Sequence, residues 1–338
     1  MTTKTLAPTD PELLKAAVSF PYFLFHHVRI RDVQADGTSK IIQFEHWPVH
    51  NEIISDLATY PRLIDLKARQ IGWSWLLAAY DAWDMLFQAG FKAGVVSAGE
   101  LEAAEFIAKC RFVLTHLPYG VPLDVDNALL LGIRGSTLMG FPSTVKAGRG
   151  FTFNRFIADE AAFHAFAQDA YASYEAATEH GQIIIVSSAG DSEKQVTNDF
   201  FETMFNGAPD NGYQARFYPW SVRPGRDEDW YEERKRRLSS KPGQVEREYP
   251  STIEEAFRSM LSLRFDVVAI KYGLVNLPTS IQVINLPEGI TPEHLAIYEL
   301  PRPNMPYLIY TDSAEGVGKD YSVTRVREAR TLRLCAEF

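Results

Sequence analysis

Short, nearly continuous apolar runs alternate along the chain with longer amphipathic stretches. The runs lie at 63–66, 93–97, 155–158 and 183–186. Such runs are typical of strands that are buried on both faces of a parallel sheet. The stretches at 73–88 and 100–117 have the apolar periodicity of helices. The pattern therefore predicts a parallel sheet flanked by helices.

Further elements are predicted on either side of these runs. Residues 11–19 indicate a short helix, and 23–31 and 39–44 alternate as two strands around an Ala-Asp-Gly-Thr turn. Residues 127–132 and 136–141 flank an Arg-Gly pair and predict a hairpin inserted before the strand at 155–158.

The last part of the chain predicts a second, smaller sheet. After a stretch rich in Pro and turn residues, strand-like segments occur at 307–312, 321–326 and 331–338. A three-stranded sheet without a covering helix cannot bury both of its faces. We therefore expect this second domain to be truncated at Phe338.

Composition narrows the possible classes of protein. The chain has 338 residues, enough for about two domains. The cysteines, Cys110 and Cys335, are too few for a disulfide framework or a zinc site, so both are expected to serve in packing. No apolar run approaches the ~20 residues that a membrane span needs, which favours a soluble, cytoplasmic protein. A net charge of -9 argues against a generally nucleic-acid-binding surface, and the charged run 226–237 is interpreted as a solvated helix face.

The strand at 63–66 leads into a helix through a turn that resembles a phosphate-binding loop. Gly72 and Ser74 match the second Gly and the Ser/Thr of the G-x-x-x-x-G-K-[ST] pattern. Lys67 stands where the first Gly belongs, and Trp73 replaces the Lys. Phosphate binding would need another cation, for which Lys67 is the first candidate and Arg69 the second. The alternative is an ordinary strand-to-helix turn.

Two further predicted strands are followed by side chains that could take part in catalysis or ligand binding. Asp159 and Glu160 follow the run at 155–158, where Asp159 could hold Mg²⁺ and Glu160 could act as general base toward water. Ser187 and Ser188 follow the run at 183–186 and could sense a terminal phosphate or its water. Alternatively, Asp159 and Glu160 form only the acidic first turn of a helix, and Ser187 and Ser188 only end a strand.

Arg149 lies between two glycines, ten positions before Asp159. Flanking glycines suit a bendable, exposed loop that could send a guanidinium to the phosphates of a neighbouring subunit. A surface arginine in a turn is the alternative reading.

In this order, the motifs resemble the large terminase subunit of tailed bacteriophages, a motor that packages DNA. The similarity runs from about residue 44 to 323. Its main segments are 67–74, 147–150 together with 157–160, 187–189, 248–257 and 311–323.

The resemblance implies an α/β fold of the P-loop (ASCE-type) class, with a mainly parallel sheet flanked by helices, followed by a truncated RNase H-like α/β domain. The implied domains are an N-terminal lobe at 1–60, the ATPase core at 61–260, a connector at 261–303 and the first nuclease strands at 304–338.

The resemblance also implies roles for individual residues. Glu160, Lys67 and Arg149 would be catalytic, with Arg149 as a finger acting in trans. The nucleotide would be bound by Lys67, Ala68, Arg69, Gln70, Gly72, Trp73 and Ser74, with Trp47 and His50 near the base. His50 stands where the family has an adenine-contacting Gln. Ser74 and Asp159 would hold Mg²⁺, and Ser187, Ser188 and Ala189 would couple hydrolysis to DNA movement.

The implied cofactors are ATP and Mg²⁺, and the implied partners are double-stranded DNA, the portal ring of a procapsid, a small terminase subunit and other copies of the chain. The copies would form a ring, a pentamer by resemblance, at the procapsid portal in the host cytoplasm, while an isolated chain could be a monomer. Asp312 matches the first metal ligand of a two-metal nuclease, but a single carboxylate cannot assemble that site. Nuclease activity is therefore expected only in a longer protein.

Two other functions remain open. A helicase or another P-loop DNA translocase would share the phosphate loop and the acid pair. A catalytically inactive, truncated protein that binds the portal would account for Trp73 in the place of the usual lysine.

Overall fold

The computed structural model describes residues 10–33, 37–189, 195–239, 243–257, 281, 295–312 and 323–338. The chain divides into two compact units, Met1–Leu261 and Ser262–Phe338. The connector predicted at 261–303 lies largely outside the described residues. In the described part, no helix is both long and apolar enough to cross a membrane.

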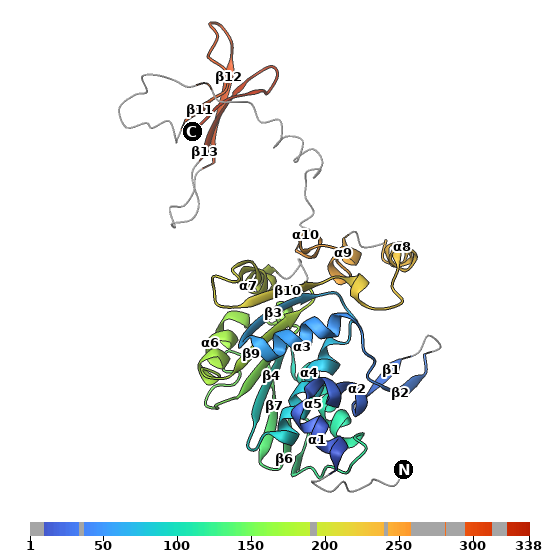
Figure 1. The fold of residues 1–338 in the computed structure, drawn as a ribbon. Helices are drawn as coiled ribbons and strands as arrows, with labels where there is room; N and C mark the ends of the chain where they lie inside the picture. Colours follow the sequence, from blue (N-terminus) through green and yellow to red (C-terminus); the bar gives the residue numbers. More distant parts are fainter. Residues whose placement is uncertain are drawn as a thin grey trace. The chain divides into compact units, whose positions relative to one another are not determined.

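A mostly parallel sheet forms the centre of the first unit (Figure 1). Its described strands are β10 (Gln214–Tyr218), β3 (Arg62–Lys67), β9 (Gln182–Ser187), β8 (Arg155–Asp159), β4 (Lys92–Ser97), β7 (Ser136–Pro142), β6 (Leu130–Ile133) and β5 (Val125–Asp126), in spatial order. Strands β10 to β7 pair in parallel, and β6 and β5 extend the sheet in antiparallel fashion. The predicted α/β class with a mainly parallel sheet is confirmed.

Helices cover both faces of this sheet (Figure 1). The helices around it are α1 (Pro11–Val18), α2 (Phe20–His26), α3 (Val49–Thr59), α4 (Trp73–Phe87), α5 (Glu100–Thr115), α6 (Ala167–Ala177) and α7 (Gln195–Asn206). Side chains of β9 alternate between the faces: Ile184 and Val186 join the cluster formed with α1 to α5, whereas Ile183 and Ile185 join the cluster formed with α6 and α7. The all-apolar run of β9 thus reflects burial on both sides.

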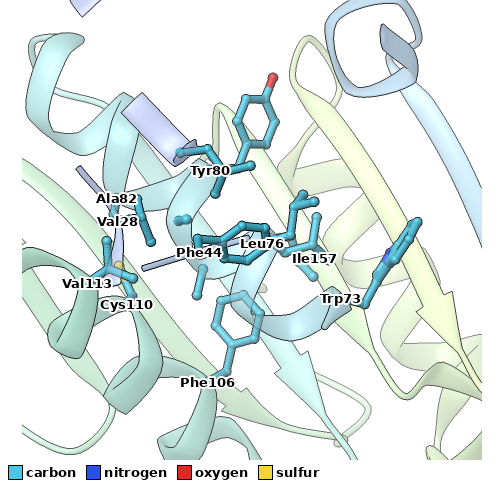
Figure 2. Close-up of a cluster of buried hydrophobic side chains, with 14 of the residues drawn as sticks. Val28, Phe44, Trp73, Leu76, Tyr80, Ala82, Phe106, Cys110, Val113 and Ile157 are labelled. Atoms are coloured by element: carbon cyan, nitrogen blue, oxygen red, sulfur yellow. The ribbon is translucent and has the colours of Figure 1, made fainter. Parts of the chain in front are cut away.

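The larger cluster packs α4 and α5 against the sheet, as Figure 2 shows. Tyr80 of α4, Phe106 of α5 and Ile157 of β8 are among its buried members. Cys110 lies in the same cluster, and both Cys110 and Cys335 are buried free thiols. The cysteines therefore pack as their number and spacing predict.

The N-terminal lobe differs from the prediction in one element. The segment expected to be a strand from residue 23 begins instead as α2, and β1 (Arg29–Val33) starts only at Arg29. The Ser19 hydroxyl accepts a hydrogen bond from the Tyr22 N–H, and Pro21 occupies the first turn, so the local sequence begins a helix. Strand β1 then pairs antiparallel with β2 (Ser39–Gln43), as the hairpin prediction requires.

The predicted hairpin at 127–141 forms from β6 and β7, but it is not a separate insertion. Strand β7 also pairs in parallel with β4, so the hairpin extends the main sheet. Arg134 and Gly135 both have positive φ, the conformation of a tight hairpin turn that matches the strand twist.

The second unit contains a small antiparallel sheet. Its described strands follow the order β11 (Ala296–Ile297), β14 (Leu334–Glu337), β13 (Val323–Glu328) and β12 (Tyr307–Asp312). The three predicted strands correspond to β12, β13 and β14, whereas β11 adds a strand from within the predicted connector. Asp312 is the last residue of β12 and pairs with Val323.

A buried ion-pair network joins β8 to α4. The Arg155 guanidinium donates hydrogen bonds to Asp81 at 3.0 Å and to Asp84 at 2.5 Å, and its Cζ lies 3.5 Å from the ring centroid of Tyr80. Burial raises the pKa of the Asp81 carboxyl to about 7, while the charge of Arg155 acts to lower that pKa. The buried Asp81 and the partly buried Asp84 therefore share one cation.

Substitution of Arg155 should be strongly destabilising. We expect Arg155→Met to lower the free energy of unfolding by about 3–5 kcal/mol, because Asp81 and Asp84 lose their cation. Urea unfolding followed by tryptophan fluorescence measures this change. Lys92→Met, at an exposed position of β4, is the control and should stay within about 0.5 kcal/mol of the wild type. An Arg155→Met effect as small as that of the control would contradict the expectation.

Candidate active site

Three adjacent parallel strands end at the same edge of the sheet. Strand β9 lies between β3 and β8, with Leu66 opposite Ser187 and Asp159 opposite Val186. Parallel strands share the direction in which they end, so residues far apart in sequence meet at their carboxyl ends. This register gathers Lys67, the acid pair and the two serines.

Lys67 and Glu160 form an ion pair at this edge. Lys67 Nζ lies 2.7 Å from Glu160 Oε1, although the two residues are 93 positions apart. The side chain of Lys67 is 5% exposed and that of Glu160 is 34% exposed. A nearly buried ammonium therefore faces a carboxylate that water can reach.

Glu160 is held in an unusual backbone conformation. Its φ of 53° and ψ of 48° place it in the left-handed region, which a non-glycine residue adopts at an energetic cost. The N–H and hydroxyl of Ser188 donate to Glu160 Oε2 at 3.0 and 3.1 Å. Burial acts to raise the pKa of Glu160, but the Lys67 charge and the hydrogen bonds from Lys67 and Ser188 outweigh it and lower that pKa.

Asp159 faces the start of α4. The Ser74 hydroxyl donates to Asp159 Oδ2 at 3.2 Å. Burial, followed by the negative charge of Glu160, raises the pKa of Asp159. A cation beside the Asp159 carboxylate would therefore be favoured.

A cavity of about 180 Å³ lies over these groups. It is lined by Lys67, Gln70, Ile71, Gly72, Trp73, Ser74, Trp75, Lys109 and Glu160. Gly72 has φ 80° at the N-terminus of α4, where no side chain caps the helix. The first N–H groups of a 15-residue helix are thus directed toward a concave site, the arrangement that binds phosphate groups in many proteins.

A second cavity of about 380 Å³ shares Gln70, Gly72 and Trp75 with the first. Trp47 and His50 also line it, with ring centroids 5.2 Å apart and nearly parallel planes. Burial, together with His46, lowers the pKa of His50 to about 4, so this imidazole is neutral near pH 7. The two predicted base-contacting residues therefore lie beside the predicted phosphate loop.

Two arginines that the sequence did not single out hold the loop from outside. Arg223 donates to the carbonyl of Gln70 at 2.6 Å, and Arg226 donates to the carbonyl of Arg69 at 3.0 Å. Arg226 also lies over the ring of Trp230, 4.4 Å from its centroid. Arg226 precedes α8 (Glu228–Arg237), the predicted solvated helix, and no local pattern indicates that this arginine turns back to the loop.

Arg69 itself does not line the cavity of about 180 Å³ beside Lys67 and Glu160. Its guanidinium pairs with Glu248 at 2.6 Å, and its N–H donates to the Glu248 carbonyl at 2.9 Å. Glu248 is the last residue of α9 (Gln244–Glu248), which α10 (Ile253–Ala256) follows. Of the two cations proposed from sequence for the loop, Lys67 is the one at the cavity.

Arg149 lies apart from these groups within the chain. It is exposed between Gly148 and Gly150, both with positive φ, and lines a different cavity with Phe151 and Ser173 of α6. Ala189, the last residue of the predicted coupling segment, is buried against the side of the sheet that α6 and α7 cover.

No protein-family model matches the sequence, and no curated protein matches it. Among solved structures, the chain is similar to the large terminase ATPase domain of Thermus phage P74-26, with 17% identity over 56% of this chain and 88% of that chain, at a TM-score of 0.44. It is also similar to a large terminase of a thermophilic bacteriophage, with 10% identity over 84% of this chain and 65% of that chain, at a TM-score of 0.49.

A third similar structure is the large terminase of bacteriophage HK97, with 12% identity over 95% of this chain and 67% of that chain, at a TM-score of 0.47. The thermophilic-phage terminase has also been solved with ADP and with ATP-γ-S. The chain spans less than two thirds of the length of that protein.

Loss of the outer anchor should loosen the loop. We expect Arg226→Ala to destabilise the first unit by about 1–3 kcal/mol, because the hydrogen bond to Arg69 and the contact with Trp230 are lost. Faster hydrogen–deuterium exchange at 68–72 would locate the change. Arg237→Ala, at the exposed end of α8, serves as control and should leave this exchange unaltered. Equal exchange in both variants would show that Arg226 does not hold the loop.

Proposed function

We propose that the first unit binds and hydrolyses Mg²⁺-ATP. The observation that carries the proposal is the meeting of Lys67 and Glu160 at one cavity beside the start of α4, where the lining hydroxyl of Ser74 donates to Asp159. A cation, a carboxylate with a lowered pKa and an acid facing a hydroxyl are the groups that phosphoryl transfer to water requires. The burial of apolar side chains does not by itself require charged groups from the ends of β3 and β8 to meet.

The proposed division of labour follows from each environment. Lys67 binds the phosphate chain and thereby leaves Glu160, which is then free to orient the attacking water and to accept its proton. Ser74 and Asp159 supply oxygen ligands of the kind that Mg²⁺ prefers. Bound Mg²⁺ supplies charge neutralisation of the phosphate oxygens. Ala68, Gln70, Gly72 and Trp73 shape the loop around the phosphates.

The neighbouring cavity is proposed to receive the base. The ring of Trp47, stacked against neutral His50, offers an apolar face to a purine. His50 replaces the Gln that the family resemblance implies, so base selectivity would depend on other contacts in this cavity, such as Gln70 and Arg223.

The larger function proposed for this ATPase is DNA packaging at the portal of a procapsid in the host cytoplasm. The order of the sequence motifs supports this proposal. Double-stranded DNA, the portal ring and a small terminase subunit are the proposed partners, and copies of the chain form a ring, proposed to be a pentamer. Ser187, Ser188 and Ala189 would transmit the state of Glu160, because Ser188 donates directly to that carboxylate. Asp312 is proposed as a metal ligand of a nuclease that further carboxylates complete.

Substitution of the ion pair separates nucleotide binding from chemistry. Glu160→Gln should lower the ATP turnover number by about 10²–10⁴-fold with ATP binding retained, since the amide cannot accept a proton. Lys67→Ala should weaken ATP binding and abolish DNA-stimulated hydrolysis, as measured by phosphate release and by calorimetry. Lys92→Ala, an exposed lysine on β4, should behave as the wild type.

Three results would contradict the proposal. Separation of a forked duplex by the wild type would favour a helicase. Absence of ATP binding would favour an inactive, portal-binding protein. Full activity of Glu160→Gln would remove Glu160 from the mechanism.

Arg149 can be tested as a finger acting in trans. Arg149→Ala should leave ATP affinity unchanged and lower the turnover of assembled rings by about 10³-fold or more, the range of known arginine fingers. Turnover is measured in the presence of DNA and portal, with Lys146→Ala, an exposed neighbour in the same loop, as control. Unchanged turnover of the Arg149 variant in assembled rings would refute the assignment.

A further inference from the structure

A second lysine, besides Lys67, lines the cavity of about 180 Å³ from a different element. Lys109 lies on α5 and lines the cavity together with Lys67, Ser74 and Glu160. Its side chain is only 18% exposed. Nothing in the linear sequence connects this position to the loop, because its neighbours on α5 fit an ordinary amphipathic helix.

The loop lacks a cation at the position where its pattern has one. Trp73 occupies that position and is buried, with its ring 4.5 Å from the ring of Tyr218 on β10. Lys67 reaches the cavity from the strand side, and in the proposed function it leaves Glu160 to bind the phosphate chain. The α4 side of the cavity therefore contributes N–H groups and a hydroxyl but no ammonium.

Among the residues that the structure describes, Lys109 contacts Glu105 and the ring of Trp75, and it can leave both. Lys109 Nζ lies 2.9 Å from Glu105 Oε1 one helical turn away, and 5.9 Å from the ring centroid of Trp75. Glu105 is 68% exposed, and ion pairs of this spacing on a helix surface are weak. A lysine has a flexible four-carbon stem, so exchange of Glu105 for a more highly charged partner costs little.

We propose that Lys109 leaves Glu105 and binds the terminal phosphate of ATP in cis, in place of the lysine that Trp73 replaces. The terminal phosphate is the appropriate target because Lys109 shares the cavity with Glu160, the group that faces the attacked phosphorus in the proposed function. Glu105 acts as a holding partner that keeps the lysine at the rim of the cavity. This inference rests on the proposed ATP site.

The test compares ATP and ADP binding, with Mg²⁺, by calorimetry on the full chain. Lys109→Ala should weaken ATP binding by about 10–100-fold and ADP binding by less than about threefold, because ADP lacks the contacted phosphate. Lys109→Arg should recover most of the affinity. Lys235→Ala is a closely matched control, since Lys235 also pairs with a glutamate on its own helix, at 2.7 Å from Glu232, and lies over an aromatic ring, but on α8.

Glu105→Gln gives a result that a merely structural lysine would not produce. Release of the holding partner should tighten ATP binding by about twofold, in line with a weak ion pair of this spacing, and should have no effect when Lys109 is already alanine. Unchanged ATP affinity of Lys109→Ala, or equal loss of ATP and ADP affinity, would overturn the inference alone. Failure of the wild type to bind ATP would overturn the proposed function and this inference with it.

Discussion

The parallel pairing of β3, β9 and β8 is the constraint on which the site depends. Their register places Lys67 and Asp159 at the ends of two strands that are separated by β9 alone. The basic end of β3 and the acidic end of β8 therefore lie close together, although they are far apart in the sequence. Because β9 lies between them, its terminal serine hydroxyls reach Glu160 from the middle of the edge. A different strand order would separate the ammonium from the carboxylate by the width of further strands, about 4.8 Å each.

The two adjacent acids are placed in different environments by this geometry. Glu160 receives the Lys67 ammonium and the Ser188 donors, which lower its pKa, whereas Asp159 is more deeply buried next to a like charge, which raises its pKa. Neighbouring carboxyls whose pKa values are driven apart are suited to different tasks. Glu160 has a left-handed backbone, and the two carboxylates have different partners: Glu160 accepts from Ser188, and Asp159 accepts from Ser74.

Sequence reasoning succeeded where the signal was local. The apolar runs of β3, β4, β8 and β9 predicted buried parallel strands, because burial on both faces leaves a continuous run of branched side chains. It failed at α2, where Phe20, Phe23 and Leu24 form one buried helical face that also resembles an apolar strand over so few residues. The acid pair, Lys67 and Ser74 were found because they follow such runs. Arg223, Arg226 and Lys109 were missed because only the tertiary fold brings them to the loop.

The turn between β3 and α4 keeps its backbone shape although its sequence departs from the phosphate-loop pattern at Lys67 and Trp73. A glycine at the start of the loop would give conformational freedom, whereas Lys67 in the same position ends β3 and pairs with Tyr218 of β10. The left-handed residues of the turn are instead Gln70 and Gly72, which both have positive φ. The strain at Gln70 is opposed by the hydrogen bond that Arg223 donates to its carbonyl. The buried ring of Trp73 fixes the start of α4 against β10. The backbone of the turn is thus held by contacts from outside it, and two lysines from other elements, Lys67 of β3 and Lys109 of α5, reach the cavity beside it.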